Sequence, residues 1–78
     1  MKTWMMQKGL FGNMVIVSGY SKQEIARLKR LPQSKAEQEV FAVLGEKMTN
    51  VIHCGYGYYG NMTFGNDCVY LRIGDTND

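Results

Sequence analysis

The stretch SKAEQEVFAVLGEKM, residues Ser34–Met48, decides the fold because it is the most strongly helical part of the chain. Ser34 and Glu37 have the spacing of a capping box, in which each side chain accepts a hydrogen bond from the other residue's backbone N–H. The apolar residues of this stretch recur at helical spacing: Ala36, Val40, Phe41, Val43, Leu44 and Met48. Gly45 favours close packing or an early helix end, because glycine has a low helix propensity. We therefore expect a helix that opens at Ser34 and turns its apolar stripe toward the core.

A second capping box stands upstream, at Ser21 and Glu24, and predicts a helix over Lys22–Arg30. We expect its inward-facing residues to be Ile25 and Leu28. Leu31 should end this helix, because the residue before a proline, here Pro32, is pushed out of the helical region. The next helix follows almost at once, so the two should form a helical hairpin.

Strand signals lie on both sides of the helices. Apolar runs at 3–7 and 14–17 are separated by two glycines and an asparagine, which predicts a β-hairpin. The run 14–17 is apolar without alternation, so we expect a central strand covered on both faces. Near the C-terminus, apolar and other side chains alternate over 68–73, which is typical of a half-buried strand.

Together these elements predict a single small α+β domain over residues 1–78, with two layers. We expect an antiparallel sheet of four to five strands, the N-terminal hairpin plus the C-terminal strands, packed against the helical hairpin. The other face of the sheet should be rich in tyrosine and methionine. A domain this small buries only about 60% of the surface of its unfolded chain, so such a face suggests a partner.

Composition limits the function classes. The chain has 78 residues, 45% of them hydrophobic, and a net charge of +2, which is far from the excess typical of nucleic-acid binding. It has two cysteines and no signal-peptide pattern at its start, so we expect a cytoplasmic protein with reduced thiols. Its apolar runs are too short to cross a bilayer, so we expect no membrane partner.

A tyrosine-rich segment is the first candidate binding site. Strand alternation over 51–59 places Tyr56 and Tyr58 on one face and Tyr59 on the other, with glycines between them. One interpretation is structural: the glycines admit the helix or let the sheet coil, and the tyrosines form its outer face. The other is a binding surface, since planar side chains can also stack on bases.

A cluster of positive charge is the second candidate. Five of the nine Lys and Arg residues fall within fourteen positions: Lys22, Arg27, Lys29, Arg30 and Lys35. Such a cluster would suit phosphate groups. A helix-turn-helix arrangement is disfavoured, because the second helix would lead with Glu37 and Glu39 toward the phosphates.

Catalytic and metal sites have little support. A hairpin turn at Gly60–Asn61 would set His53 opposite Cys68 as a base and nucleophile, whereas one residue of slip would set Cys54 there instead. One histidine and two distant cysteines fall short of a zinc site. We therefore expect a protein that is not an enzyme and has no cofactor.

The sequence thus favours a non-enzymatic protein-interaction module, a small binder or inhibitor of a larger protein target. Small size and a surplus of tyrosine and methionine, which are enriched in interface cores, motivate this hypothesis. Phages and mobile elements often encode such proteins, so an origin of that kind is expected on base rates. A second copy of the chain is another candidate partner. The alternative is a small nucleic-acid-binding protein that uses the basic helix and the tyrosine-rich strand.

Overall fold

The computed structural model describes residues 1–9, 12–50 and 58–73. Within these ranges the chain forms seven elements in this order: β1 (Thr3–Gly9), β2 (Gly12–Ser18), α1 (Lys22–Arg30), α2 (Gln33–Leu44), α3 (Glu46–Asn50), β3 (Tyr58–Phe64) and β4 (Cys68–Ile73). The predicted strand over 51–59 falls mainly on residues outside the described ranges.

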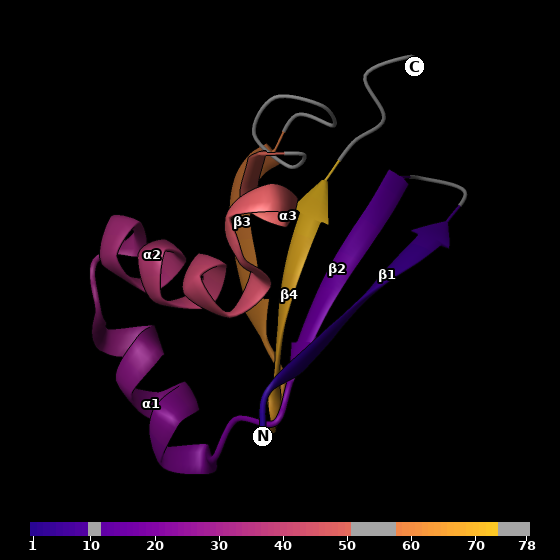
Figure 1. Ribbon diagram of the computed structural model, residues 1–78. Helices are drawn as coiled ribbons and strands as arrows, with labels where there is room; N and C mark the ends of the chain where they lie inside the picture. The colour runs from indigo at the N-terminus through magenta and orange to yellow at the C-terminus, as the bar shows by residue number, and fades with distance from the viewer. Residues whose placement is uncertain (10–11, 51–57, 74–78) are drawn as a thin grey trace.

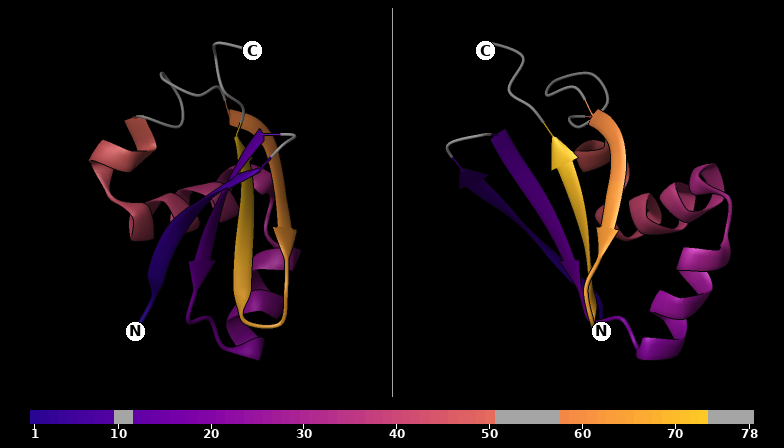
Figure 2. Two further views of the ribbon diagram at one scale, coloured as in Figure 1. Left: turned by 90° about the vertical axis from the view of Figure 1, so that its right-hand side faces the viewer. Right: turned by 180° about the vertical axis from the view of Figure 1, so that it is seen from behind.

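The described strands form one four-stranded sheet in the order β1-β2-β4-β3, and each neighbouring pair is antiparallel. All three helices lie on the same side of this sheet (Figures 1 and 2). The predicted α+β class, the N-terminal hairpin and the helical hairpin are therefore confirmed. No helix of the described ranges lies on the other face of the sheet.

The core fills the space between the helices and one face of the sheet. Every second residue of β2 and β4 points into it, which confirms the alternation predicted for residues 68–73. The strands contribute Val15, Val17, Val69, Leu71 and Ile73, and the helices Ile25, Leu28, Ala36, Val40 and Leu44.

Strand β2 is central, as expected, but the prediction that it is covered on both faces was wrong. Val15 and Val17 are fully buried, whereas Met14 and Ile16 are only partly buried. The helices cover one face of the sheet, so the side chains that point the other way meet none of them. An apolar run without alternation therefore marks a half-covered strand here.

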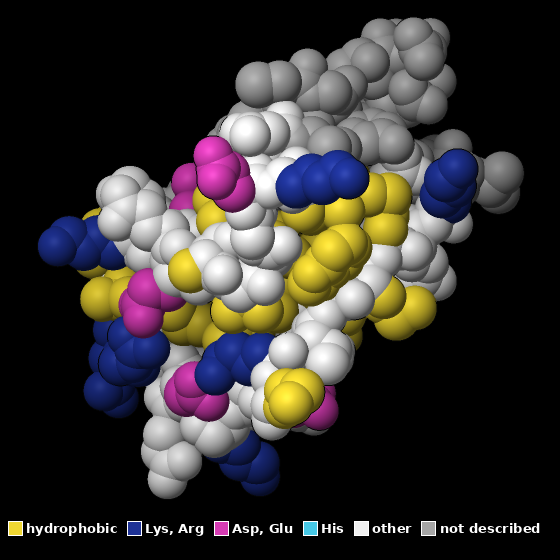
Figure 3. Space-filling model, in the orientation of Figure 1, with side chains coloured by type: hydrophobic (Ala, Val, Ile, Leu, Met, Phe, Trp, Pro, Cys, Tyr) yellow, Lys and Arg dark blue, Asp and Glu magenta, His cyan; other side chains and the backbone are white. Residues whose placement is uncertain are grey.

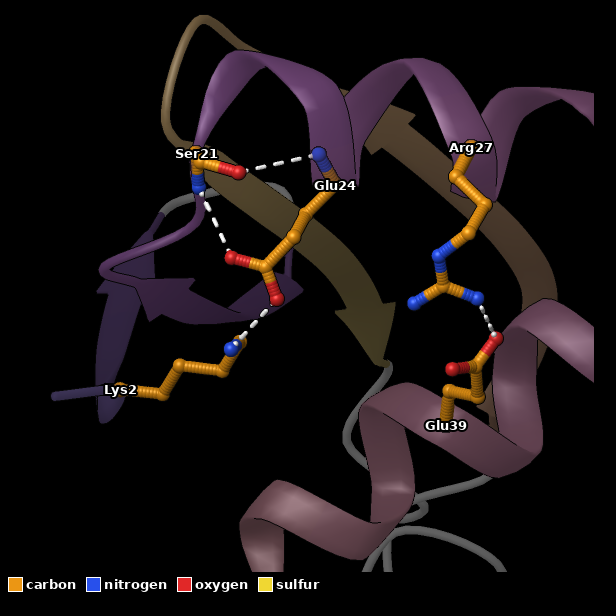
Figure 4. Close-up of polar contacts among 5 residues, drawn as sticks. All are labelled: Lys2, Ser21, Glu24, Arg27 and Glu39. Carbon is orange, nitrogen blue, oxygen red and sulfur yellow. Dashed lines mark hydrogen bonds and ion pairs between the residues drawn. The ribbon is translucent and has the colours of Figure 1, made fainter.

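The start of α1 follows the predicted capping box. The backbone N–H of Glu24 donates to the Ser21 hydroxyl over 3.1 Å, and the backbone N–H of Ser21 donates to a Glu24 carboxylate oxygen over 3.0 Å (Figure 4). The helix ends at Arg30, because Leu31 before the proline takes an extended conformation with φ −77° and ψ 152°.

The predicted capping box at Ser34 was wrong. Helix α2 begins at Gln33 with Pro32 as its N-cap, and no side chain caps it. The backbone N–H of Ala36 donates to the Pro32 carbonyl over 3.0 Å. The Glu37 carboxylate instead accepts a hydrogen bond from the Gln33 amide over 3.0 Å. Proline already has a φ close to helical values and can precede a helix directly, so Ser34 falls inside the first turn.

Gly45 ends α2, which agrees with the expectation of an early end. Its φ of 89° and ψ of 163° lie in a region that residues with a side chain rarely adopt. The chain then starts α3, in which the backbone N–H of Thr49 donates to the Gly45 carbonyl over 3.0 Å. The predicted helical stretch is thus divided into two helices.

Candidate interaction site

The sheet face opposite the helices carries an apolar row that crosses three strands. Met5 of β1 is paired with Ile16 of β2, and Ile16 is paired with Tyr70 of β4. Directly opposite residues in antiparallel strands point to the same side of a sheet. The Met5 side chain is 59% exposed, and Ile16 and Tyr70 are partly buried. We call Met5, Ile16 and Tyr70 the open-face row, and the left view of Figure 2 shows this side of the sheet with the helices behind it.

Mostly polar side chains border the open-face row. One neighbouring row consists of Gln7, Met14 and Arg72, and the other of Thr3, Ser18 and Cys68. The Ser18 hydroxyl and the Cys68 thiol lie 3.5 Å apart and share a hydrogen bond. An apolar centre with a polar rim is the usual composition of a protein interface.

Tyr70 remains neutral over the physiological range. The electrostatic interaction with the neighbouring Cys68 is the largest cause that raises the pKa of the Tyr70 hydroxyl above its ordinary value of 10.0. Partial loss of hydration is the next cause, and the Asp67 carboxylate adds to it. A neutral tyrosine presents an apolar ring and a hydroxyl that can donate a hydrogen bond, which suits a contact with another protein.

Of the predicted tyrosines, Tyr58 and Tyr59 belong to β3, where the structure describes the backbone. Tyr56 lies outside the described residues. Tyr70 was not among the binding residues predicted from the sequence. The alternation of Cys68, Tyr70 and Arg72 with buried residues nevertheless placed it on the side away from the core. That alternation was the signal that could have identified it.

The predicted basic cluster does not form one surface, because Lys35 belongs to α2 and the other four residues occupy different flanks of α1. On one flank, Arg27 donates a hydrogen bond of 2.8 Å to the Glu39 carboxylate of α2 (Figure 4). This pair lowers the pKa of Glu39 and raises that of Arg27. Glu24, on the same helix, forms an ion pair of 2.7 Å with Lys2. Arg27 is therefore engaged within the molecule.

The other cationic side chains remain at the surface. Lys22, Lys29 and Arg30 are exposed, and none of them forms an ion pair with a residue of the described ranges. Lys and Arg side chains are visible around α1 at the lower left of Figure 3. Lys22 and Lys29 line a surface hollow of about 360 Å³, together with Ile25, Ala26, Gly65 and Asn66. This basic flank belongs to the helical layer, so it lies across the sheet from the open-face row.

The hairpin turn considered at Gly60–Asn61 was wrong. Both residues lie inside β3, which continues to Phe64. The chain turns later, where the backbone N–H of Gly65 donates to the Cys68 carbonyl over 2.9 Å. Cys68 is paired with Ser18 of β2, and His53 and Cys54 lie outside the described residues.

Within 1–9, 12–50 and 58–73, no group of three or more His, Cys, Asp or Glu side chains is placed to hold a metal ion. None of the helices in these ranges has the length and apolar character needed to cross a membrane. Comparison of the chain with protein-family models, curated proteins and solved structures gave no match.

Proposed function

We propose that this protein is a non-enzymatic interaction module that binds a larger protein through the open-face row. The observation that carries the proposal is the position of Met5, Ile16 and Tyr70 side by side on a sheet face that no described helix covers. Contiguous apolar patches with a polar border mark interaction sites more often than ordinary surface.

The open-face row crosses the middle of the sheet. Ile16 lies on the central strand β2, and its neighbours Met5 and Tyr70 lie on the strands on either side. Full burial of a side chain of this size stabilises a complex by about 1.5–3 kcal/mol, before the losses of rotational and side-chain freedom are subtracted. A partner that covers all three side chains would thus gain a small apolar centre of the kind that dominates interface energy.

The test is a capture experiment with the tagged protein, washed at low and at high salt. We expect a protein partner that survives the high-salt wash, because apolar contacts respond little to ionic screening. Ile16→Thr should abolish its capture, since threonine keeps the β-branched shape while adding a hydroxyl to the row. The matched control is Gln7→Thr, which lies on the same face in the bordering row. Equal capture by the wild type and Ile16→Thr would refute the proposal.

A nucleic-acid binder is the second candidate, favoured by the exposed flank of Lys22, Lys29 and Arg30. Contacts of these cations with phosphate would release counterions, so binding would weaken steeply as salt increases. The same capture experiment separates the two functions. Nucleic acid that is retained at low salt, lost at high salt and lost in Lys22→Ala with Lys29→Ala would support this second candidate.

A further inference from the structure

We propose that two copies of this chain pair through the outer edge of β1, antiparallel, to form one continuous sheet. Strand β1 is the first in the order β1-β2-β4-β3, and no strand of the described ranges pairs with its outer side. An antiparallel strand directs the N–H and C=O groups of alternate residues to one side. At an edge these outward groups have no partner strand, and they are a template for another chain.

This edge lacks most of the features that prevent pairing. Natural edge strands are usually short, bulged, charged or interrupted by proline. Strand β1 is seven residues long and pairs with β2 in one uninterrupted register. It has no proline, and its one charge, Lys8, stands near its end, so the segment 3–7 is uncharged. Strand β3, at the opposite edge, shows a register shift between Tyr58 and Met62. The two edges therefore differ in their readiness to accept a strand.

Strand β1 exposes one large apolar side chain on each face of this edge. Trp4 is paired with Val17, a core residue, and therefore points to the helical side, yet it is 38% exposed. Met5 points to the opposite side and is 59% exposed. In Figure 3, hydrophobic side chains are visible at the surface between the helices and β1. An added strand would cover both side chains, one on each face.

A second β1 fits this edge because the segment is complementary to itself. In a two-fold pairing centred on Met6, Trp4 faces Lys8 of the second copy and Met5 faces Gln7 of the second copy. The ammonium of Lys8 would then lie near the indole face, which is a favourable cation–π arrangement. A pairing centred on Met5 would instead set Lys2 against Lys8, two like charges, so the register centred on Met6 is favoured. Strand β1 can therefore pair with a second copy of itself, without a partner of different sequence.

The inference goes beyond the proposed function and can fail independently of it. Its test uses the purified chain alone, whereas the proposed function is tested by capture of a target. Dimerisation and target binding would nevertheless reinforce each other. Met5 is the end of the open-face row at the β1 edge, so pairing would bring the rows of the two copies together across the two-fold axis.

The first test is the molecular mass in solution over a series of concentrations. We expect the wild type to reach twice its chain mass of 8.9 kDa. Met5→Lys should remain at the monomer mass, because a charge at the edge opposes the approach of a second strand. The matched control is Thr63→Lys, on the opposite edge strand β3 and paired with Tyr70 at the far end of the same row. This variant should dimerise like the wild type.

Hydrogen exchange of the backbone amides gives a readout that is specific for strand pairing. In a dimer paired through β1, consecutive amides from 3 to 8 are protected, whereas in a monomer only the alternate amides that face β2 are protected. Gln7→Lys is a second variant, which replaces one exposed polar side chain with another and keeps the hairpin intact. It too should shift the mass to that of the monomer.

Three outcomes would overturn the inference. A wild type that stays monomeric at every concentration would exclude a dimer. A dimer that both Met5→Lys and Thr63→Lys dissociate would mean that the open faces stack on one another. A dimer that survives both Met5→Lys and Gln7→Lys would have its interface elsewhere.

Discussion

Tyr20→Phe should stabilise this protein, although it removes a polar group and adds no contact. Tyr20 is a core residue with 7% of its surface exposed, and its hydroxyl has no hydrogen-bond partner among the described residues. A buried hydroxyl without a partner loses its hydration and gains nothing in return, a loss of about 1–3 kcal/mol. Burial is also the largest cause that raises the pKa of Tyr20, so the side chain is neutral in any ordinary buffer.

The other interactions of this side chain survive the substitution. The Lys2 ammonium lies 5.0 Å from the centre of the Tyr20 ring, and phenylalanine offers the same aromatic face. The apolar surface of the ring remains in the core. Taking the lower part of the range, we expect the free energy of unfolding to rise by about 1 kcal/mol.

Urea denaturation measures this change. With an m-value near 1 kcal/mol/M, the low end for small proteins, the midpoint should rise by about 1 M at unchanged m. Tyr70→Phe is the control, because its side chain lies on the sheet face away from the core and is only partly buried, and its effect should stay within about 0.5 kcal/mol. A decrease of about 1 kcal/mol for Tyr20→Phe would refute the reasoning, since it would show that the hydroxyl has a partner in the folded protein.

Three further predictions concern the helix ends. Ser21→Ala removes the N-cap of α1 and should lower the free energy of unfolding by about 1 kcal/mol in the same assay. Gly45→Ala should destabilise by about 1–3 kcal/mol despite the open space around its Cα, because its φ of 89° and ψ of 163° are unfavourable for alanine; an unchanged midpoint would contradict this. The hydrogen bond with the Lys2 side chain is the main cause that lowers the pKa of Glu24 from 4.5 to about 2. As the pH falls, the Glu24 carboxylate therefore takes up a proton in the unfolded chain before it does so in the folded protein. The contribution of Glu24 to the free energy of unfolding is fully present above the unfolded-state pKa of 4.5 and is lost as the pH falls toward 2. Unfolding midpoints across this range should depend less on pH in Glu24→Gln.

Local patterns predicted those elements whose cause is local. The capping box at Ser21 needs only two side chains three residues apart, and it appears as predicted. The alternation in β4 likewise follows from the geometry of one strand. The box at Ser34 has the same spacing, but Pro32 lies two residues earlier and starts the helix first. Two competing local signals were present, and the one nearer to the preceding helix prevailed.

The errors and omissions at the candidate site have a non-local cause. The apolar run in β2 is compatible with a strand that helices cover on one face or on both faces. The placement of the helices relative to the sheet decides between these two arrangements. Arg27 was grouped with its basic neighbours, yet it pairs with Glu39, twelve residues away, because α1 and α2 pack side by side. No spacing rule within one helix reveals such a pair. Tyr70 was passed over because tyrosines cluster more densely at 56–59.

The shape of this sheet links the two proposals. A four-stranded sheet with helices on one side leaves its central strands half covered, and here the uncovered half includes Ile16 on β2 and Tyr70 on β4. Pairing through β1 would satisfy the backbone of the edge but would leave that face open, because an added strand extends a sheet sideways. A dimer would therefore not compete with a target for the open-face row. It would instead present two rows at once, and a target that engages both would be held more tightly than either row could hold it alone.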